Sequence, residues 1–215
     1  HLIQQQNSDQ QNYSQHDVTE LIVFLTKQSD QTPDTKIRDI RVLLDNHTVT
    51  DVTLQATDVF FIDTEELVKY HHHILRMILQ CLSSEDRVRF FHTNHGVNAI
   101  TLIHVIAAAY DKTGETMKTV LELFREDRCY HLLSVQASIA QQAPLHWVCG
   151  NNNSAAVLEV IMRQVTSKQT RYKLLQIPSS GGWTPLHHAA WLNARRVIRI
   201  IADSVSSHHL IHLLT

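Results

Sequence analysis

From residue 72 onwards, apolar residues fall in short runs with helical spacing, and polar stretches separate these runs. The runs "HHILRMILQCL", "TVLELF", "AVLEVIMRQV" and "RVIRIIADSV" carry apolar residues at roughly i, i+3, i+4 and i+7. This is the pattern of a helix that buries one face. Five glycines and four prolines are few for the many turns of a sheet protein. The pattern therefore predicts a helical protein.

The same features recur at a nearly constant distance along the chain. Leu145-His146 and Leu186-His187 are 41 residues apart, and His104 lies 42 residues before His146. Apolar doublets, each closing a short charged-then-apolar stretch, follow one another at steps of 42, 42 and 39 residues: Phe90-Phe91, Leu132-Leu133, Leu174-Leu175 and Leu213-Leu214. Because independent markers keep one order, the chain is predicted to be an array of repeated units.

Each unit is predicted to contain three helices and a turn. The first helix begins at Thr184-Pro185-Leu186-His187, where threonine caps the helix and proline takes the first helical position. The second helix is the apolar run, and the third ends in the doublet. A polar segment such as "QIPSSGGW" or "SVQASIAQQA" suits a turn or an extended hairpin. One unit cannot bury both faces of its helices, so neighbouring units are expected to stack.

These motifs resemble the ankyrin repeat family. The residues that carry the resemblance are Thr184-Pro185-Leu186-His187 with Ala189-Ala190, Pro144-Leu145-His146, and Thr101-Leu102-Ile103-His104 with Ala107-Ala108. An ankyrin unit has about 33 residues, and the 41 to 42 residues here leave room for the third helix. The resemblance implies an all-α fold, an ankyrin-type α-solenoid of stacked helical repeats with short hairpin or turn connections.

The array is predicted to fill most of the chain. A Gln/Asn-rich segment at residues 1–16 precedes the array at residues 17–215. The array divides into a partial unit at 17–44 and units at about 45–91, 92–133, 134–175 and 176–215. In the unit that starts near residue 45, Gln55-Ala56 stand where Leu-His is expected. The chain starts inside one unit and stops at the end of another, so we expect a fragment of a longer protein.

Charge and cysteine content narrow the classes of partner. The formal net charge is −2 and the 19 Lys and Arg residues are scattered, so no binding of nucleic acid or of an anionic membrane is expected. No stretch approaches 18 uninterrupted apolar residues, so no membrane insertion is expected. Cys81, Cys129 and Cys149 lack paired spacing, which indicates a reducing, cytoplasmic location. Delivery into a host cell as an effector is the alternative.

Sixteen histidines raise the question of a metal site. The resemblance implies that His104, His146 and His187 make structural hydrogen bonds between neighbouring units. His71-His72-His73 are consecutive on a predicted helix, where successive side chains point about 100° apart and cannot converge on one ion. His208 and His212 share a helical face but have no nearby ligands to complete a zinc site. We therefore expect no metal and no cofactor.

The sequence also lacks recognisable catalytic motifs. No Gly-rich phosphate loop, Gly-x-Ser-x-Gly elbow or His-Glu-x-x-His is present. Cys149 lies near His146, and an exposed cysteine with a lowered pKa beside a histidine can act as a nucleophile. Cys149 nevertheless occupies the place of Ala190 in the next unit, a small core position. We expect no catalysis by these residues.

The remaining prediction is a surface for a protein partner. The resemblance implies that the residues just before the motif and at the end of the first helix line the concave face of the array, where a partner protein would bind. These residues are Trp183, Trp191 and Leu192, then Gln142 and Asn151, and then Ile100. Tryptophan is enriched among residues that dominate binding energy. In the alternative, Trp183 packs on its hairpin and Trp191 or Leu192 covers a further unit. Trp147 is expected to lie in the core.

The predicted function is therefore a protein–protein interaction scaffold of unknown partner. The alternative is a recruiting arm of a larger enzyme, signalling protein or microbial effector whose catalytic domain lies outside these residues. A structural spacer is the third possibility. The array is expected to be a monomer or to self-associate weakly through exposed ends.

Overall fold

The computed structural model describes residues 75–76, 78–80, 82–95, 98–108, 111–138, 140–151 and 155–214. Helix predominates in this part of the chain, and the only strands there are two residues long, which confirms the prediction of a helical protein. The Gln/Asn-rich segment, the predicted unit at 17–44, the first part of the unit at 45–91 and His71-His72-His73 lie outside the described residues.

The last three predicted units each hold three helices in the predicted order. They are α7 (Leu102–Ala108), α8 (Glu115–Leu121) and α9 (Glu126–Ser134); α10 (Pro144–Cys149), α11 (Ala155–Gln164) and α12 (Lys168–Leu175); and α13 (Pro185–Trp191), α14 (Arg195–Ser204) and α15 (Ser207–Leu214). The preceding unit ends with α6 (Ser84–His92). A short antiparallel pair, β1 (Asn94–His95) and β2 (Ile100–Thr101), places Asn94 opposite Thr101.

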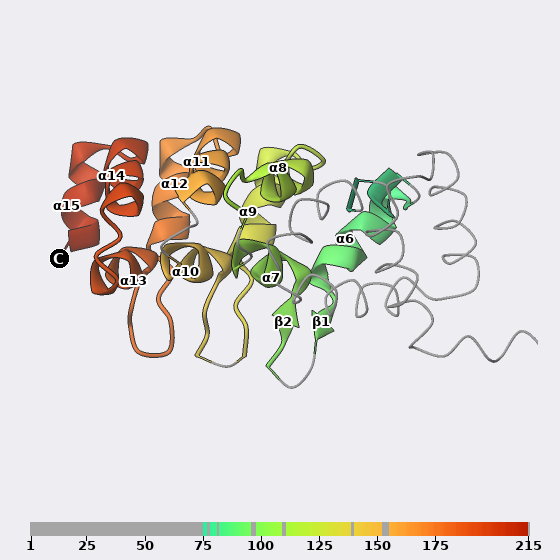
Figure 1. Ribbon diagram of the computed structural model, residues 1–215, viewed down its shortest axis with the longest axis horizontal. Coiled ribbons are helices and arrows are strands. Elements are labelled where there is room, and N and C mark those ends of the chain that lie inside the picture. The colour runs from blue at the N-terminus through green and yellow to red at the C-terminus, as the bar shows by residue number, and fades with distance from the viewer. Residues whose placement is uncertain are drawn as a thin grey trace, which may run out of the picture.

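Corresponding helices of successive units lie against one another. Helix α10 contacts α7 on one side and α13 on the other, and α11 contacts α8 and α14 in the same way. Helix α12 contacts α9. In Figure 1 the helices α7, α10 and α13 form one row and α8, α11 and α14 form a second row. The first and second helices of the last three units, and the third helices α9 and α12, therefore pack against their counterparts about one unit away in the sequence.

The apolar doublets that close the units form much of the core. Phe90 and Phe91 are fully buried, and their rings meet edge to face with centroids 5.4 Å apart. The doublets at the ends of α9 and α12 are buried as well. In the last doublet Leu213 is buried, but Leu214 is 69% exposed. The apolar doublet is therefore fully buried in the inner units, whereas at the end of α15 only one of its two leucines is buried.

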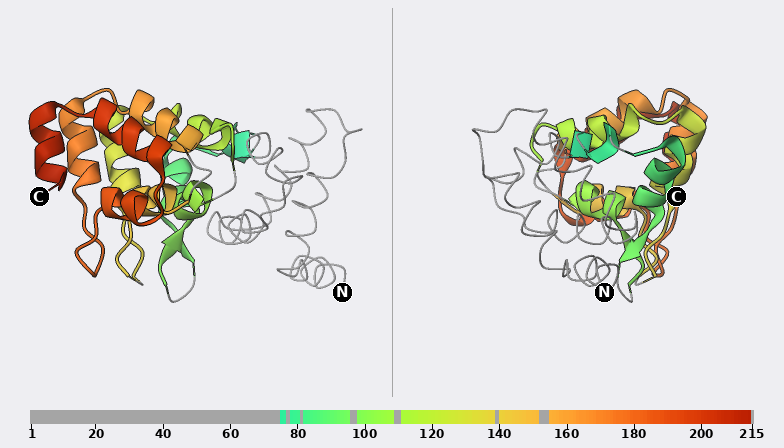
Figure 2. Two further views of the ribbon diagram at one scale, coloured as in Figure 1. Left: turned by 60° about the vertical axis from the view of Figure 1, so that its left-hand side comes forward. Right: turned by 90° about the vertical axis from the view of Figure 1, so that its right-hand side faces the viewer.

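Three connections of similar size, at residues 94–101, 135–143 and 177–184, precede α7, α10 and α13. They project in the same direction from the helices (Figure 2). One backbone hydrogen bond joins each neighbouring pair, from Ser138 N to Asn98 O at 2.8 Å and from Ser180 N to Ala140 O at 2.8 Å. These bonds hold the three hairpins side by side.

Candidate protein-interaction surface

The motif histidine closes the start of the first helix in each unit. The backbone N–H of Thr184 donates to Nδ1 of His187 at 3.1 Å, and the Thr184 hydroxyl lies 2.7 Å from the same nitrogen. Ala143 N–H donates to Nδ1 of His146 at 3.0 Å. The pair Thr101 and His104 has the same geometry as Thr184 and His187. The threonine hydroxyl therefore bonds the imidazole, whereas the N-cap pattern predicts a bond to a backbone N–H.

The second ring nitrogen of the inner histidines bonds the next unit. His104 Nε2 lies 3.1 Å from the carbonyl oxygen of Gln142, and His146 Nε2 lies 3.0 Å from that of Trp183. Because Nδ1 accepts a hydrogen bond, Nε2 carries the proton and donates. The expected hydrogen bonds between units are thus present for these two histidines. They fix the backbone at Gln142 and Trp183, two of the predicted partner-binding residues.

Both bridging histidines are held in the neutral form. Burial lowers the pKa of His104 to about 4, against a partial opposing effect of its bond to Gln142. Burial likewise lowers the pKa of His146. A neutral imidazole can accept at one nitrogen and donate at the other, so its protonation state matches the two hydrogen bonds that it makes.

Two tryptophans form an exposed aromatic cluster beside the last hairpin. Trp191 is 76% exposed and Trp183 is 40% exposed, and their ring centroids are 5.7 Å apart. His188 meets Trp183 edge to face at 5.7 Å and meets His146 at 5.3 Å. His188 connects the cluster to the motif of the preceding unit and was not among the predicted residues. The only signal for it in the sequence is its place directly after the motif histidine.

The other predicted residues are less open than the tryptophans. Leu192 and Ile100 are half-buried and pack against the core. Gln142 is half-buried. The half-buried Asn151 donates its side-chain amide to the carbonyl oxygen of Ala108 at 3.0 Å, so this amide stabilises the contact between two units. Trp147 is half-buried rather than fully in the core, with its ring 5.6 Å from that of His104.

Asp, Glu, Lys and Arg are absent from the segments that form the hairpins and the first helices of the last three units. Residues 90–110, 129–158 and 174–194 contain no Asp, Glu, Lys or Arg, and these segments hold the three hairpins and helices α7, α10 and α13. We call the surface of these hairpins and helices the hairpin face. Ion pairs form elsewhere, as between Arg196 and Glu159 at 2.9 Å. The absence of charge over these segments is visible in the sequence but is not part of the motif that identified the units.

The two described cysteines, Cys129 and Cys149, are both buried. Burial raises the pKa of the Cys149 thiol to about 12 and that of Cys129 to about 11, so neither is a thiolate near neutral pH. Within the described ranges, no three His, Cys, Asp or Glu side chains gather as metal ligands. No helix in the same part of the chain is long and apolar enough to cross a bilayer.

No protein-family model matches the chain, and no curated protein matches it either. The ankyrin resemblance therefore stays a prediction that rests on the motifs.

Proposed function

We propose that the protein is an ankyrin-type repeat scaffold, an all-α solenoid that binds a partner protein through its hairpin face. The solenoid is supported by contacts that recur 37 to 43 residues apart, among them the bonds from His104, His146, Gln136 and Asn151 to the following or preceding unit. Such regular contacts between neighbours are how repeat proteins stabilise units that cannot fold singly.

The observation that carries the binding proposal is the exposed pair Trp183 and Trp191. Two neighbouring indole rings left open to solvent present a large apolar area that a partner can cover, and truncating such an anchor typically costs about 2 kcal/mol or more of binding energy. The hairpin beside them is held by Ser180 and by His146. A surface that is already ordered loses little entropy on binding.

The lack of charge on the hairpin face defines how such a complex should respond to salt. Interactions between exposed charges weaken as ionic strength rises. A complex on this face is held by apolar contact and neutral hydrogen bonds, so raising the salt from 50 to 500 mM should change its affinity little. An acidic or basic partner surface has no counterpart here.

The experiment compares proteins captured from a cell extract by immobilised wild-type chain, by the double variant Trp183→Ala/Trp191→Ala and by Ile211→Ala. Ile211 on α15 is 61% exposed and lies outside the hairpin face, so its variant controls for the loss of an exposed apolar side chain. We expect proteins that bind the wild type and Ile211→Ala but are lost with the double variant. Equal capture by all three chains would reject the tryptophans as anchors.

A further inference from the structure

Two equivalent junctions between third helices are built differently. At the junction of α9 and α12, the carboxylate of Glu126 accepts from the Thr166 hydroxyl at 2.6 Å and from the Ser167 backbone N–H at 2.8 Å. These bonds lower the pKa of Glu126. Glu126 is the first residue of α9 and Ser167 is the N-cap of α12, so a side chain of one unit caps the helix of the next.

At the junction of α6 and α9 this arrangement has no counterpart. The residue 42 positions before Glu126 is Ser84, the first residue of α6. The residues 42 positions before Thr166 and Ser167 are Phe124 and Arg125. The side chain of the N-cap residue Arg125 makes no capping bond to α9, and Ser84 is too short to supply one from α6. The place that a carboxylate fills at one junction is left open at the other.

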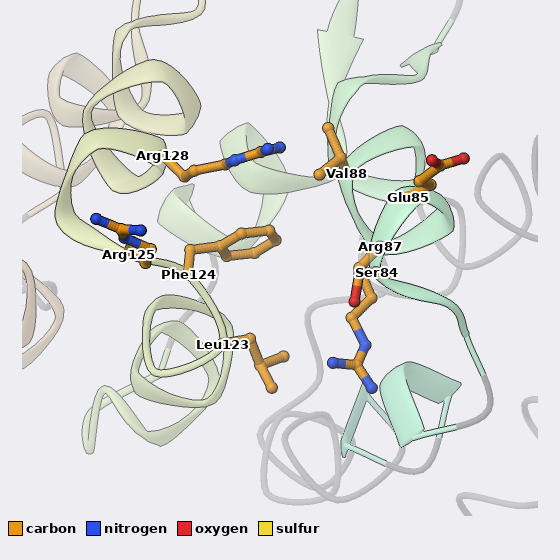
Figure 3. A pocket seen from close by; sticks show the side chains of 8 residues that line it. All are labelled: Ser84, Glu85, Arg87, Val88, Leu123, Phe124, Arg125 and Arg128. Carbon is orange, nitrogen blue, oxygen red and sulfur yellow. The ribbon is translucent and has the colours of Figure 1, made fainter.

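A pocket of about 260 Å³ occupies this place (Figure 3). Val88 of α6 and the side chains of Leu123 and Phe124 give it apolar walls, and Leu123 is 40% exposed. The ring of Phe124 also packs edge to face on the ring of Phe91, with centroids 5.7 Å apart, which holds Phe124 in place. The pocket is smaller than the roughly 300–1,000 Å³ usual for small-molecule sites. Its size suits one or two side chains.

Three arginines line the pocket, with one carboxylate. Arg87 donates through Nε to the Leu79 carbonyl oxygen at 2.8 Å, and Arg125 lies 3.9 Å from Asp127. Glu85 also lines the pocket and offsets part of the positive charge. In Figure 3 the Arg128 side chain extends towards Val88. None of the described carboxylates forms an ion pair with Arg128, so its guanidinium remains open to an acidic group.

We propose that this pocket binds an acidic side chain, with an apolar neighbour, from a partner polypeptide. The carboxylate pairs with Arg128 and takes the place beside the Arg125 N–H that corresponds to the place of Glu126 at the next junction. The apolar neighbour packs on Leu123 and Phe124. A free inorganic anion would leave these apolar walls uncovered, and Glu85 disfavours a doubly charged group. None of the residues used here belongs to the hairpin face, so this site is independent of the function proposed above.

To test this proposal, the full ¹⁵N-labelled chain is titrated with the peptide acetyl-Leu-Glu-Leu-amide and its amide signals are followed by NMR. The control is the peptide acetyl-Leu-Gln-Leu-amide, which has the same size but no charge. We expect amide shifts confined to residues 84–88 and 123–128 and saturating with the Glu peptide. Loss of a charge-assisted bond should make binding of the Gln peptide about tenfold weaker. Arg128→Gln should weaken binding of the Glu peptide by a similar factor. Equal binding of the two peptides, or shifts elsewhere in the chain, would overturn the proposal.

A second pair of variants asks whether a built-in carboxylate fills the site. Ser84→Glu places a carboxylate at the position that Glu126 has in α9, so it should abolish binding of the Glu peptide. Ser84→Gln adds a side chain of nearly the same size without the charge and should retain most binding. Trp183→Ala/Trp191→Ala should bind the peptide as the wild type does. If Ser84→Glu bound normally, or if the tryptophan variant lost binding, the pocket would not be the site.

Discussion

The motif histidines His146 and His187 have the same local sequence but different surroundings. Each accepts a backbone N–H three residues earlier at Nδ1, at 3.0 and 3.1 Å. His146 is buried and its Nε2 bonds the Trp183 carbonyl of the next unit, whereas His187 is exposed. No bond from Nε2 of His187 is present within the described residues. The local motif thus supplies the cap, and a following unit supplies burial and the second bond.

The doublets show the same contrast. Leu175 at the end of α12 is fully buried, and Leu214 at the end of α15 is exposed. Both are last residues of a third helix, so the helix itself does not decide their burial. The contribution of such a residue to stability therefore depends on whether a neighbouring unit buries it. The same motif should therefore tolerate substitution very differently in different units.

The largest expected effect comes from substituting the inner histidine. His146→Ala removes two hydrogen bonds, leaves the buried backbone N–H of Ala143 without its acceptor and opens a cavity, so it should lower the free energy of unfolding by about 3 kcal/mol. His187→Ala removes only the local cap at an exposed site and should cost about 0.5–1 kcal/mol. Urea unfolding at pH 7.5 measures both. Equal losses in the two variants would contradict the role given to the neighbouring unit.

A pH titration should sharpen the contrast for the other inner histidine. The folded pKa of His104 is about 4, below the unfolded value of about 6.5, so the unfolded chain binds more protons between these values. Its contribution to stability is complete above pH 6.5 and is lost as the pH falls. The free energy of unfolding should drop by about 2 kcal/mol from this group between pH 7.5 and 5. The lowered pKa values of His146 and His188 act in the same direction.

The variant that checks this assignment is His104→Gln, followed by urea unfolding at several pH values above 5. In this range the buried carboxyl of Asp111, whose pKa is lowered, stays ionised. We expect the variant to be less stable at pH 7.5 but to show a flatter dependence on pH than the wild type. If its slope matched that of the wild type, another group would be responsible.

A smaller effect is expected at the junction of α9 and α12. Glu126→Gln weakens the cap on α12 and, because the site is largely open to solvent, should lower the free energy of unfolding by only about 0.5–1 kcal/mol. Asp127→Asn removes the neighbouring charge without touching this contact and serves as the control. In urea unfolding, Glu126→Gln should have a lower free energy of unfolding than Asp127→Asn. The reverse order would show that the carboxylate does not join the two helices.

The smallest effect on folding is expected at the aromatic cluster. Trp191 is largely exposed, so Trp191→Ala should change the free energy of unfolding by less than about 0.5 kcal/mol. A thermal melt beside Ile211→Ala, the matched exposed position, measures the difference. A loss above 1.5 kcal/mol would place Trp191 in the structural core of the last unit instead of on a binding surface.

Local signals in the sequence account for the helices. Pro144 and Pro185 begin α10 and α13, as the motif predicts. Helix α7 begins at Leu102, which stands in the place of proline, because the pair Thr101 and His104 is still present to close the helix start. Each doublet lies within or at the end of a third helix, as predicted.

The local sequence pattern does not predict the individual contacts between units. That Asn151 gives its amide to Ala108 depends on how two helices approach, which no local pattern specifies. The pocket beside Phe124 depends on the difference between Ser84 and Glu126, two residues of adjacent units whose equivalence matters only once α6, α9 and α12 are placed. The exposure of Trp191 likewise depends on what covers α13.

The hairpin face, with its two tryptophans, is the proposed binding site for a partner protein. The most direct measurement places a photo-crosslinking amino acid, p-benzoylphenylalanine, at position 183, 191 or 211 and irradiates the chain in cell extract. We expect one common crosslinked partner from positions 183 and 191 and none from position 211. Crosslinks from position 211 alone, or no crosslink from 183 and 191, would contradict it.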